Sequence, residues 1–312
     1  MLNPSRRPDR RIRSGYLIVA AAFVLALLTV VGRGTDAEAV PDTRPEAHFW
    51  QANGRVLKIL ETDDAVYLAG RFTALRGPQG QTVSRNRLAA LDPDTGAPLA
   101  FNPNMSGDVW SLAVSGDGST LYAGGDFTRV GGVTRPRAAA FDTASGALES
   151  WNPRADGRVK GIAAVPGRVV LGGKFSTLAG VSRPNLGAVS PTTGAVQTDW
   201  DTTTNGIVHD LAVAPDGSRL LVAGDFSTVS GTPAGSQRKI ASLDPSTGEA
   251  QPWASHPNFE FFDLDVSDSR LFAAAGGSGG HAVAWDLDTG QQDWVGFGDG
   301  DAVAIVHQNG AV

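Results

Sequence analysis

One short phrase recurs at intervals of about fifty residues along this 312-residue chain. It reads LYAGGDFTRVGG at 121–132, VLGGKFSTLAG at 170–180 and LVAGDFSTVSG at 221–231. A sequence that repeats itself at such a period builds one supersecondary unit several times over. The repeat constrains the fold more strongly than composition does, because each unit must bury its apolar face against a neighbouring unit.

Each unit contains about four short apolar runs separated by turns rich in Gly, Pro, Asp and Ser. An aromatic residue opens the units, at Trp50, Phe101, Trp151, Trp200, Trp253 and Trp294. Period-two alternation in runs of four to eight residues predicts β-strands, and the glycines that close the turns fit tight hairpins. Four-stranded units at this period predict an all-β β-propeller of about 50-residue blades. The repeats lie near 50–100, 101–150, 151–199, 200–252 and 253–293, with a partial sixth at 294–312.

The incomplete sixth unit allows two interpretations. Either the chain is a truncated copy of a longer array, or its last strand docks onto the first blade and closes the ring. We favour truncation, although a ring with an unfilled position would expose strand edges that promote aggregation.

The N-terminus has the composition of an export signal. Five arginines precede an uncharged apolar run at 16–31, and Ala37-Glu38-Ala39 follows as a candidate cleavage site. This pattern predicts a hydrophobic helix within residues 1–39 that acts as a signal peptide or as an uncleaved signal anchor. Residues 40–49 then form a linker to the domain at 50–312, which we expect outside the cell membrane, either anchored or secreted.

Charge and composition exclude several kinds of site and partner. Residues 1–39 hold six arginines and three acids, a net charge of +3, whereas the whole chain carries −6, so residues 40–312 carry −9. An acidic domain is a poor electrostatic match for phosphate backbones, and we expect no nucleic-acid partner. The chain has no cysteine, and its five histidines show no metal-ligand spacing, so we expect neither a metal site nor a cofactor.

The residues that recur in several units are interpreted as structural. Glycines inside a strand pattern mark a bulge or a close backbone approach, and repeated aromatics fill the contact between neighbouring blades. These repeated residues are Phe72, Phe127, Phe175, Phe226, Gly124, Gly125, Gly172, Gly173, Trp151, Trp200, Trp253 and Trp294.

Two repeated charged positions have both a functional and a structural interpretation. The acids Asp92, Asp142, Asp244 and Asp286 could form a carboxylate ring, but we predict that each caps its own turn. The arginines Arg85, Arg135, Arg183 and Arg238 could line an anion site, but we predict bonds to a neighbouring blade or to a backbone carbonyl. Asp126 and Asp225 share a position with Arg71 and Lys174, and this change of sign favours solvated or cross-blade pairing over catalysis.

The second unit carries the motif GGDFTRVGGVTR at 124–135, followed by AFDTASG at 140–146 and WNP at 151–153. This sequence resembles the bacterial delta-60 repeat family of β-propellers, a propeller domain of unknown function. The likeness extends over roughly residues 50–294 and is weakest in the fifth unit. It implies an extracellular or envelope-associated propeller and leaves the activity open, since the family has no established set of catalytic residues.

We therefore expect a non-catalytic binding or scaffold module for a protein or glycan at the cell envelope. The alternative is a quinoprotein-like or glycan-active enzyme with its site in the axial funnel, and fold alone does not distinguish the two. A cluster of polar residues, each present in one blade only, would indicate a site. The irregular fifth unit supplies the candidate binding residues His281, Trp285, Glu260 and Asp263.

Overall fold

The described part of the chain is all-β and contains no helix. A computed structural model describes residues 50–232, 239–253, 259–276, 280–297 and 305. The predicted N-terminal hydrophobic helix and the linker lie outside these residues. Among the described residues, no helix is long and apolar enough to cross a membrane.

Five antiparallel sheets follow one another along the sequence. Their first strands are β2 (Val56–Glu61), β7 (Val109–Val114), β12 (Arg158–Val165), β17 (Ile207–Val213) and β20 (Phe261–Val266). Their second strands are β3 (Val66–Gly70), β8 (Thr120–Gly125), β13 (Arg168–Lys174), β18 (Leu220–Asp225) and β21 (Arg270–Ala275). Their third strands are β6 (Leu88–Leu91), β11 (Ala138–Asp142), β16 (Leu186–Val189), β19 (Ile240–Leu243) and β22 (His281–Asp286). In each sheet the second strand lies between the first and the third.

The expected fourth strand pairs as a strand only in the fifth sheet, where β23 (Gln292–Phe297) lies beside β22. In the other four units the corresponding segment makes a single bridge to the third strand, as Pro98 does to Leu91. In the fifth unit the pairing continues past the aromatic residue, because β23 includes Trp294 and extends to Phe297, whereas in the other four units it stops at the single bridge. The prediction of four-stranded units is therefore wrong for the first four.

Seven further short strands of the described chain lie outside the five sheets. They comprise β1 (Gln51–Ala52), β4 (Ala74–Arg76), β5 (Thr82–Ser84), β9 (Arg129–Val130), β10 (Val133–Thr134), β14 (Thr177–Leu178) and β15 (Val181–Ser182). β1, β4 and β5 form one small sheet, and β9–β10 and β14–β15 form two-stranded hairpins. β1 precedes the first sheet, and the other short strands lie between the second and third strands of the first three sheets.

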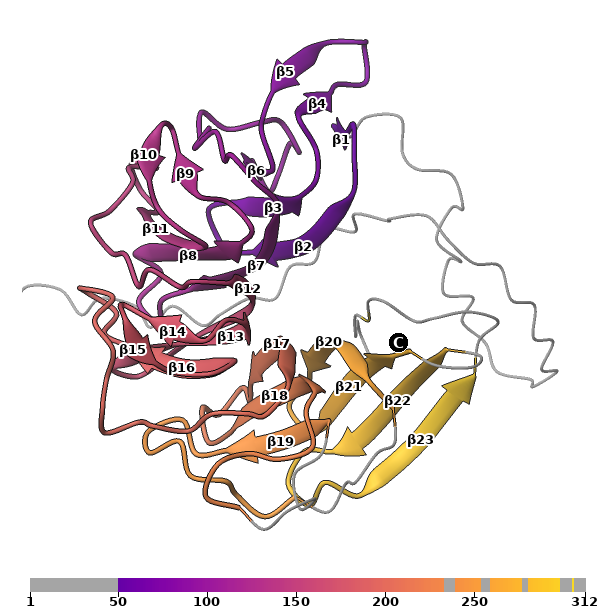
Figure 1. The fold of residues 1–312 in the computed structure, drawn as a ribbon. Coiled ribbons are helices and arrows are strands. Elements are labelled where there is room, and N and C mark those ends of the chain that lie inside the picture. Colours follow the sequence, from indigo (N-terminus) through magenta and orange to yellow (C-terminus); the bar gives the residue numbers. More distant parts are fainter. Residues whose placement is uncertain (1–49, 233–238, 254–258, 277–279, 298–304, 306–312) are drawn as a thin grey trace, which may run out of the picture.

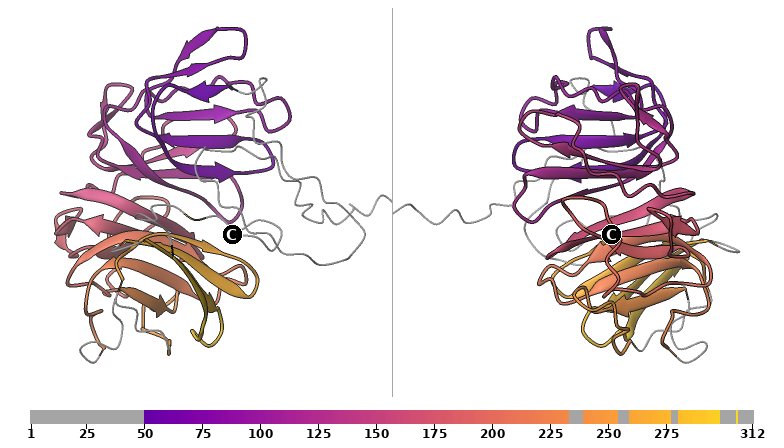
Figure 2. Two further views of the ribbon diagram at one scale, coloured as in Figure 1. Left: turned by 90° about the vertical axis from the view of Figure 1, so that its right-hand side faces the viewer. Right: turned by 60° about the vertical axis from the view of Figure 1, so that its left-hand side comes forward.

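The five sheets lie along an arc with their first strands on its inner side (Figure 1). β7 contacts both β2 and β12, and β17 contacts both β12 and β20. The side views show the same sheets stacked from the first to the fifth (Figure 2). Among the described strands no backbone pairing joins the first sheet to the fifth, so the sheets do not form a closed ring.

The apolar core is divided among the contacts between successive sheets. Phe127 packs with residues of the first and second sheets, Phe175 with the second and third, and Phe226 with the third and fourth. Each of these phenylalanines therefore fills the contact between its own sheet and the preceding one. Phe72, in the first unit, packs on the other face of the first sheet near Trp50.

The repeated tryptophans fill the same contacts, between the preceding sheet and the sheet of the unit that each tryptophan opens. Trp151 is fully buried, and its indole N–H donates to the carbonyl of Ser190, in a turn of its own unit, at 2.9 Å. Trp200 and Trp253 are buried in the cores of the third–fourth and fourth–fifth contacts. Trp294, in β23, is the exception, with 36% of its surface exposed.

The glycine pairs lie where two backbones approach closely. A Cβ at Gly124 would lie 2.6 Å from the Val159 side chain of the next sheet, and one at Gly125 would overlap the carbonyl of Asp108. Gly172 and Gly173 repeat both contacts one unit later, against Val208 and Arg158. The first glycine of each pair therefore lets the next sheet approach, and the second admits the start of the first strand.

Candidate functional site

Each first strand carries a β-bulge at the same place. The pairing register shifts between Val56 and Lys58, and the equivalent shift recurs in β7, β12, β17 and β20. A bulge adds one unpaired residue to a strand and redirects side chains. We call the added residues the bulge level: Leu57, Trp110, Lys160, His209 and Phe262. We call the residues that follow them the inner level: Lys58, Ser111, Gly161, Asp210 and Asp263.

The inner level contains one cation between two carboxylates. The Lys58 ammonium donates to Asp210 at 3.2 Å and to Asp263 at 3.1 Å. Asp210 is buried and also accepts from the backbone N–H of Leu264 at 3.1 Å, while Asp263 accepts from the N–H of Ile305. Lys58 belongs to the first sheet and its partners to the fourth and fifth. The arc therefore curves far enough for its two ends to meet through side chains.

The charged groups of the inner level shift one another's pKa values. Burial, followed by the negative charge of Asp263, raises the pKa of Asp210 to about 7 although Lys58 acts in the opposite direction. Burial disfavours the charged form of Lys58, but the two carboxylates outweigh this effect and raise the pKa of Lys58 above its usual range. Lys58 is thus a permanent cation, and Asp210 is the group that titrates near neutral pH.

At the bulge level, polar side chains of three successive units form a chain: Lys160 of β12, His209 of β17, and Glu260, which directly precedes β20. Lys160 contacts Nδ1 of His209, and Nε2 of His209 lies 2.7 Å from the carboxylate of Glu260. A lysine ammonium only donates and a carboxylate only accepts, so we assign the proton of the neutral imidazole to Nε2. His209 is buried, whereas Glu260 and Lys160 are partly exposed.

Burial and neighbouring positive charges disfavour the charged forms of Lys160 and His209 and so lower the pKa of each group. Burial, and then the positive charge of Arg158, lowers the pKa of Lys160. Burial, and then the charge of Lys160, lowers the pKa of His209 in spite of its bond to Glu260. At neutral pH the imidazole is therefore uncharged, and its Nδ1 can accept a hydrogen bond from the Lys160 ammonium.

Trp110 lies beside this chain, against three cations. The guanidinium carbons of Arg71 and Arg158 lie 4.8 and 5.1 Å from the indole centroid, and the Lys160 ammonium lies 5.5 Å from it. The indole N–H donates to Asp126 at 3.1 Å. The Trp110 side chain is partly exposed, so this group of cations is within reach of solvent.

Each arginine next to Trp110 is held by a carboxylate of a neighbouring unit. Arg71 pairs with Asp108 at 2.7 Å, and Arg158 pairs with Asp126 at 2.7 Å. Arg71 and Asp126 occupy the same repeat position with opposite charges. Their partners, Asp108 and Arg158, also share a repeat position, and their charges are reversed in the same way. Cross-unit pairing is therefore confirmed for Asp126. Asp225 instead pairs with Lys239 of its own unit.

The candidate residues from the fifth unit separate into two groups. Glu260 and Asp263 belong to the bulge-level chain and the inner level, respectively. Trp285 is fully buried in the core against Phe261, and His281 is buried beside Phe259, with ring centroids 4.0 Å apart. The structure therefore does not bring His281 and Trp285 to the two levels.

Sequence reasoning missed five residues of the two levels. They are Lys58, Trp110, Lys160, His209 and Asp210. A signal was present, because all five follow the first-strand valine by one or two positions, where the units differ from one another. Their convergence depends on the bulges and on the curvature of the arc, which the repeat pattern alone does not define.

The repeated turn acids serve their own turns, as predicted. Asp92 accepts from the backbone N–H of Thr95 at 2.8 Å and from its hydroxyl at 2.7 Å. Asp142 makes the same two contacts with Ser145, and equivalent bonds recur at Asp244 and Asp286. These hydrogen bonds lower the pKa of all four carboxyl groups.

The repeated arginines bind backbone carbonyls, which confirms the structural interpretation for those that can be described. Arg85 donates to the carbonyl of Leu99 at 2.7 Å, and Arg135 donates to that of Glu149 at 2.8 Å. Arg183 donates to the carbonyl of Ser182 at 3.0 Å. Arg238 lies outside the described residues.

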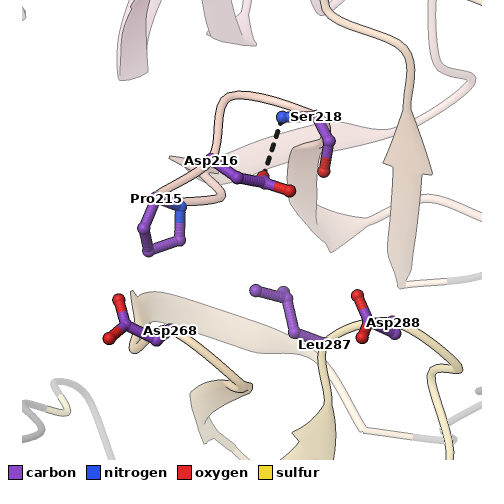
Figure 3. A pocket seen from close by; sticks show the side chains of 6 residues that line it. All are labelled: Pro215, Asp216, Ser218, Asp268, Leu287 and Asp288. Atoms are coloured by element: carbon purple, nitrogen blue, oxygen red, sulfur yellow. Dashed lines mark hydrogen bonds between the residues drawn. The ribbon is translucent and has the colours of Figure 1, made fainter.

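A shallow hollow of about 340 Å³ lies between the turns of the fourth and fifth sheets (Figure 3). It is lined by Pro215, Asp216, Ser218, Asp268, Leu287 and Asp288. The carboxylate of Asp216 accepts from the backbone N–H of Ser218 at 2.9 Å, and Figure 3 shows Asp268 and Asp288 on either side of Leu287. These acids do not converge on one point, and the described residues contain no group of three acidic or histidine side chains that could hold a metal ion.

No protein-family model matches the chain, and comparison with curated proteins finds no match. The function must therefore be inferred from the geometry of the bulge level and the inner level.

Proposed function

We propose that this chain is an exported β-propeller that serves as a non-catalytic binding module for a protein or glycan at the cell envelope. Its binding site is the bulge level, around Trp110, Lys160 and His209. The inner level beneath it holds the ends of the array together through Lys58.

Three features support the propeller arrangement. Successive sheets are in contact through their first strands, the bulge recurs at one level in all five, and Lys58 links the first sheet to Asp210 and Asp263. The resemblance of the repeat to the delta-60 family supports the same arrangement. The arginine-rich start and the apolar run at 16–31 support export.

One observation carries the assignment of the site. Trp110, Lys160 and His209 occupy equivalent positions in three sheets, yet each residue type occurs at that position only once. Residues that maintain a repeat recur in most units, as the turn acids do in four of them, whereas a ligand needs a particular set of groups in one place. Aromatic, cationic and imidazole groups together suit a polar ligand.

A ligand screen on the full-length chain tests this proposal. Compounds that raise the melting temperature of the parent protein are tested again on Trp110→Ala and on Trp294→Ala, which removes another partly exposed tryptophan. We expect the stabilisation to disappear in Trp110→Ala and to persist in Trp294→Ala. Equal responses in the two variants would locate the site elsewhere.

The hydrogen-bonded chain from Lys160 through His209 to Glu260 favours a second candidate, a glycan-active or quinoprotein-like enzyme with its site at the same level. An imidazole oriented by a carboxylate can move protons. If a bound glycan is converted by the parent protein and remains unconverted with His209→Ala, the chain is an enzyme. Recovery of unchanged glycan from the parent protein supports the binding module.

A further inference from the structure

The cations around Trp110 differ in how far their charge is neutralised. Arg71 and Arg158 each form an ion pair of 2.7 Å with an aspartate. Among the described residues, Lys160 forms no ion pair with a carboxylate. Its close partner is the neutral imidazole of His209, and Glu260 is bound to the opposite nitrogen of that ring. Of the three cations around Trp110, Lys160 is therefore the one without a carboxylate in contact within the described part of the chain.

We infer that the bulge level contains a subsite for the carboxylate of an acidic glycan, with the Lys160 ammonium as the group that binds it. The inference rests on the proposed function and specifies its ligand. A lysine ammonium has three N–H donors, and one of them is used by His209. The remaining donors can bind a carboxylate beside Trp110, where Arg71 and Arg158 add positive potential.

The described surface favours a glycan over a protein as the source of the carboxylate. Protein interfaces need an apolar centre surrounded by a polar rim. The large apolar side chains exposed on the described surface are Ile59, Val133, Val181 and Trp294. These lie on β2, β10, β15 and β23. The apolar members of the bulge level, Leu57, Trp110 and Phe262, are only partly exposed and share this level with Lys160 and His209. An acidic sugar, in contrast, requires chiefly hydrogen-bond donors, charge and a few aromatic edges.

Binding of a carboxylate to Lys160 should be coupled to the uptake of protons from solution. Lys160 faces Trp110 of β7, Arg158 of its own strand and His209 of β17, and Glu260, Asp126 and Asp210 act on it electrostatically. Burial and Arg158 lower the pKa of Lys160, so at a given alkaline pH a larger fraction of this group is uncharged than of an ordinary lysine. A bound carboxylate stabilises the charged form, and binding must then be accompanied by proton uptake.

Calorimetric titration of the full-length chain with trigalacturonic acid, compared with its neutral methyl ester, tests the inference. We expect the acid to bind and the ester to bind at least about tenfold more weakly, since a charge-assisted hydrogen bond is lost. Titrations near neutral pH and in mildly alkaline buffers of different ionisation enthalpy measure the protons taken up. Uptake is expected to increase with pH.

Two substitutions at Lys160 and one elsewhere sharpen the experiment. Lys160→Met should weaken binding of the acid by about tenfold. Lys160→Arg should retain binding but lose the proton uptake, because a guanidinium stays charged at these pH values. Lys174→Met removes an exposed lysine of the adjacent strand β13 and should leave both quantities unchanged.

The outcomes separate the inference from the proposed function. If acid and ester bind equally and Trp110→Ala abolishes both, the binding site stands and the carboxylate subsite is wrong. If neither sugar binds but an acidic peptide does so in a Lys160-dependent manner, the glycan assignment is wrong and a protein partner replaces it. If binding is unaffected by both Trp110→Ala and Lys160→Met, the inference and the location of the site both fail.

Discussion

The turn carboxylates and the inner-level carboxylates are the same chemical group in opposite surroundings. Asp142 lies at an exposed turn and accepts hydrogen bonds from Ser145, which lower its pKa. Asp210 is buried next to Asp263, and its pKa is raised to about 7. The turn acid is copied in four units, and the inner-level arrangement occurs once.

This contrast separates what a unit needs from what the whole array needs. Every hairpin must satisfy its own backbone N–H groups, so a short polar acceptor recurs at this turn: an acid in four units and Ser190 in the third. Joining the first sheet to the fourth and fifth is required only once, and it uses a cation against two acids from distant parts of the chain. Residues that break the repeat are therefore the ones to examine for functions of the whole molecule.

The largest effect is expected from removing the cation of the inner level. Lys58→Met leaves Asp210 and Asp263 facing each other without a counter-charge. Breaking a fully buried ion pair costs several kcal/mol, but the Lys58 side chain is 27% exposed and solvent reduces the cost. We expect the free energy of unfolding, measured by denaturant titration, to fall by about 2 kcal/mol.

Lys58→Arg and the double variant Lys58→Met/Asp210→Asn serve as controls. The first keeps the charge and should retain most of the stability. The second removes one of the two repelling acids and should recover part of the loss. If Lys58→Met costs no more than Lys174→Met on the exposed surface, the inner level does not join the ends of the array.

The sequence was sufficient to predict those parts of the molecule whose determinants lie within one unit. Strand alternation, the turns that end in Gly146 or Gly248, and the capping role of Asp142 all depend on residues a few positions apart. The repeat also predicted that Gly124 lies at a close backbone approach, because such a position tolerates no side chain. All-β structure is confirmed throughout the described residues.

The site depends instead on distances between units, and there the prediction was incomplete. Glu260 and Asp263 were selected because they stand in an unusual segment, and they do reach the two levels. His281 and Trp285 come from the same irregular unit but face the core. Which side of a strand a residue occupies changes at the bulge, and the position of a bulge follows from packing between sheets rather than from alternation.

A moderate effect of pH on stability should distinguish Asp210 from the turn acids. Its folded-state pKa of about 7 exceeds the ordinary value of 3.8, so the folded protein binds a proton that the unfolded chain releases. The stabilisation is complete below the ordinary value and is lost as the pH rises through about 7. We expect the free energy of unfolding to fall by about 1 kcal/mol between about pH 6 and pH 8.

Asp210→Asn provides the matched control for this pH dependence. The amide does not titrate, so the decrease between about pH 6 and pH 8 should flatten in denaturant titrations repeated across the pH range. An unchanged slope in Asp210→Asn would assign the titration to another group, and His209 would be examined next.

The smallest effect is expected at a single turn acid, and it should appear on the acidic side. Hydrogen bonds from Ser145 lower the pKa of Asp142, so its contribution to stability is present above the ordinary value of 3.8 and is lost as the pH falls below it. Asp142→Ala should lower the melting temperature at neutral pH by less than Lys58→Met does, while Asp142→Asn, which keeps the acceptor oxygen, should lower it less still. The difference between parent and Asp142→Ala should shrink in acid, where the parent carboxyl is protonated. The two classes of carboxylate would then determine the pH dependence of stability on opposite sides, the turn acids in acid and Asp210 near neutral pH. A decrease in melting temperature in Asp142→Ala that stays constant down to strongly acidic pH would remove this distinction. It would mean that the turn does not depend on the charge of Asp142.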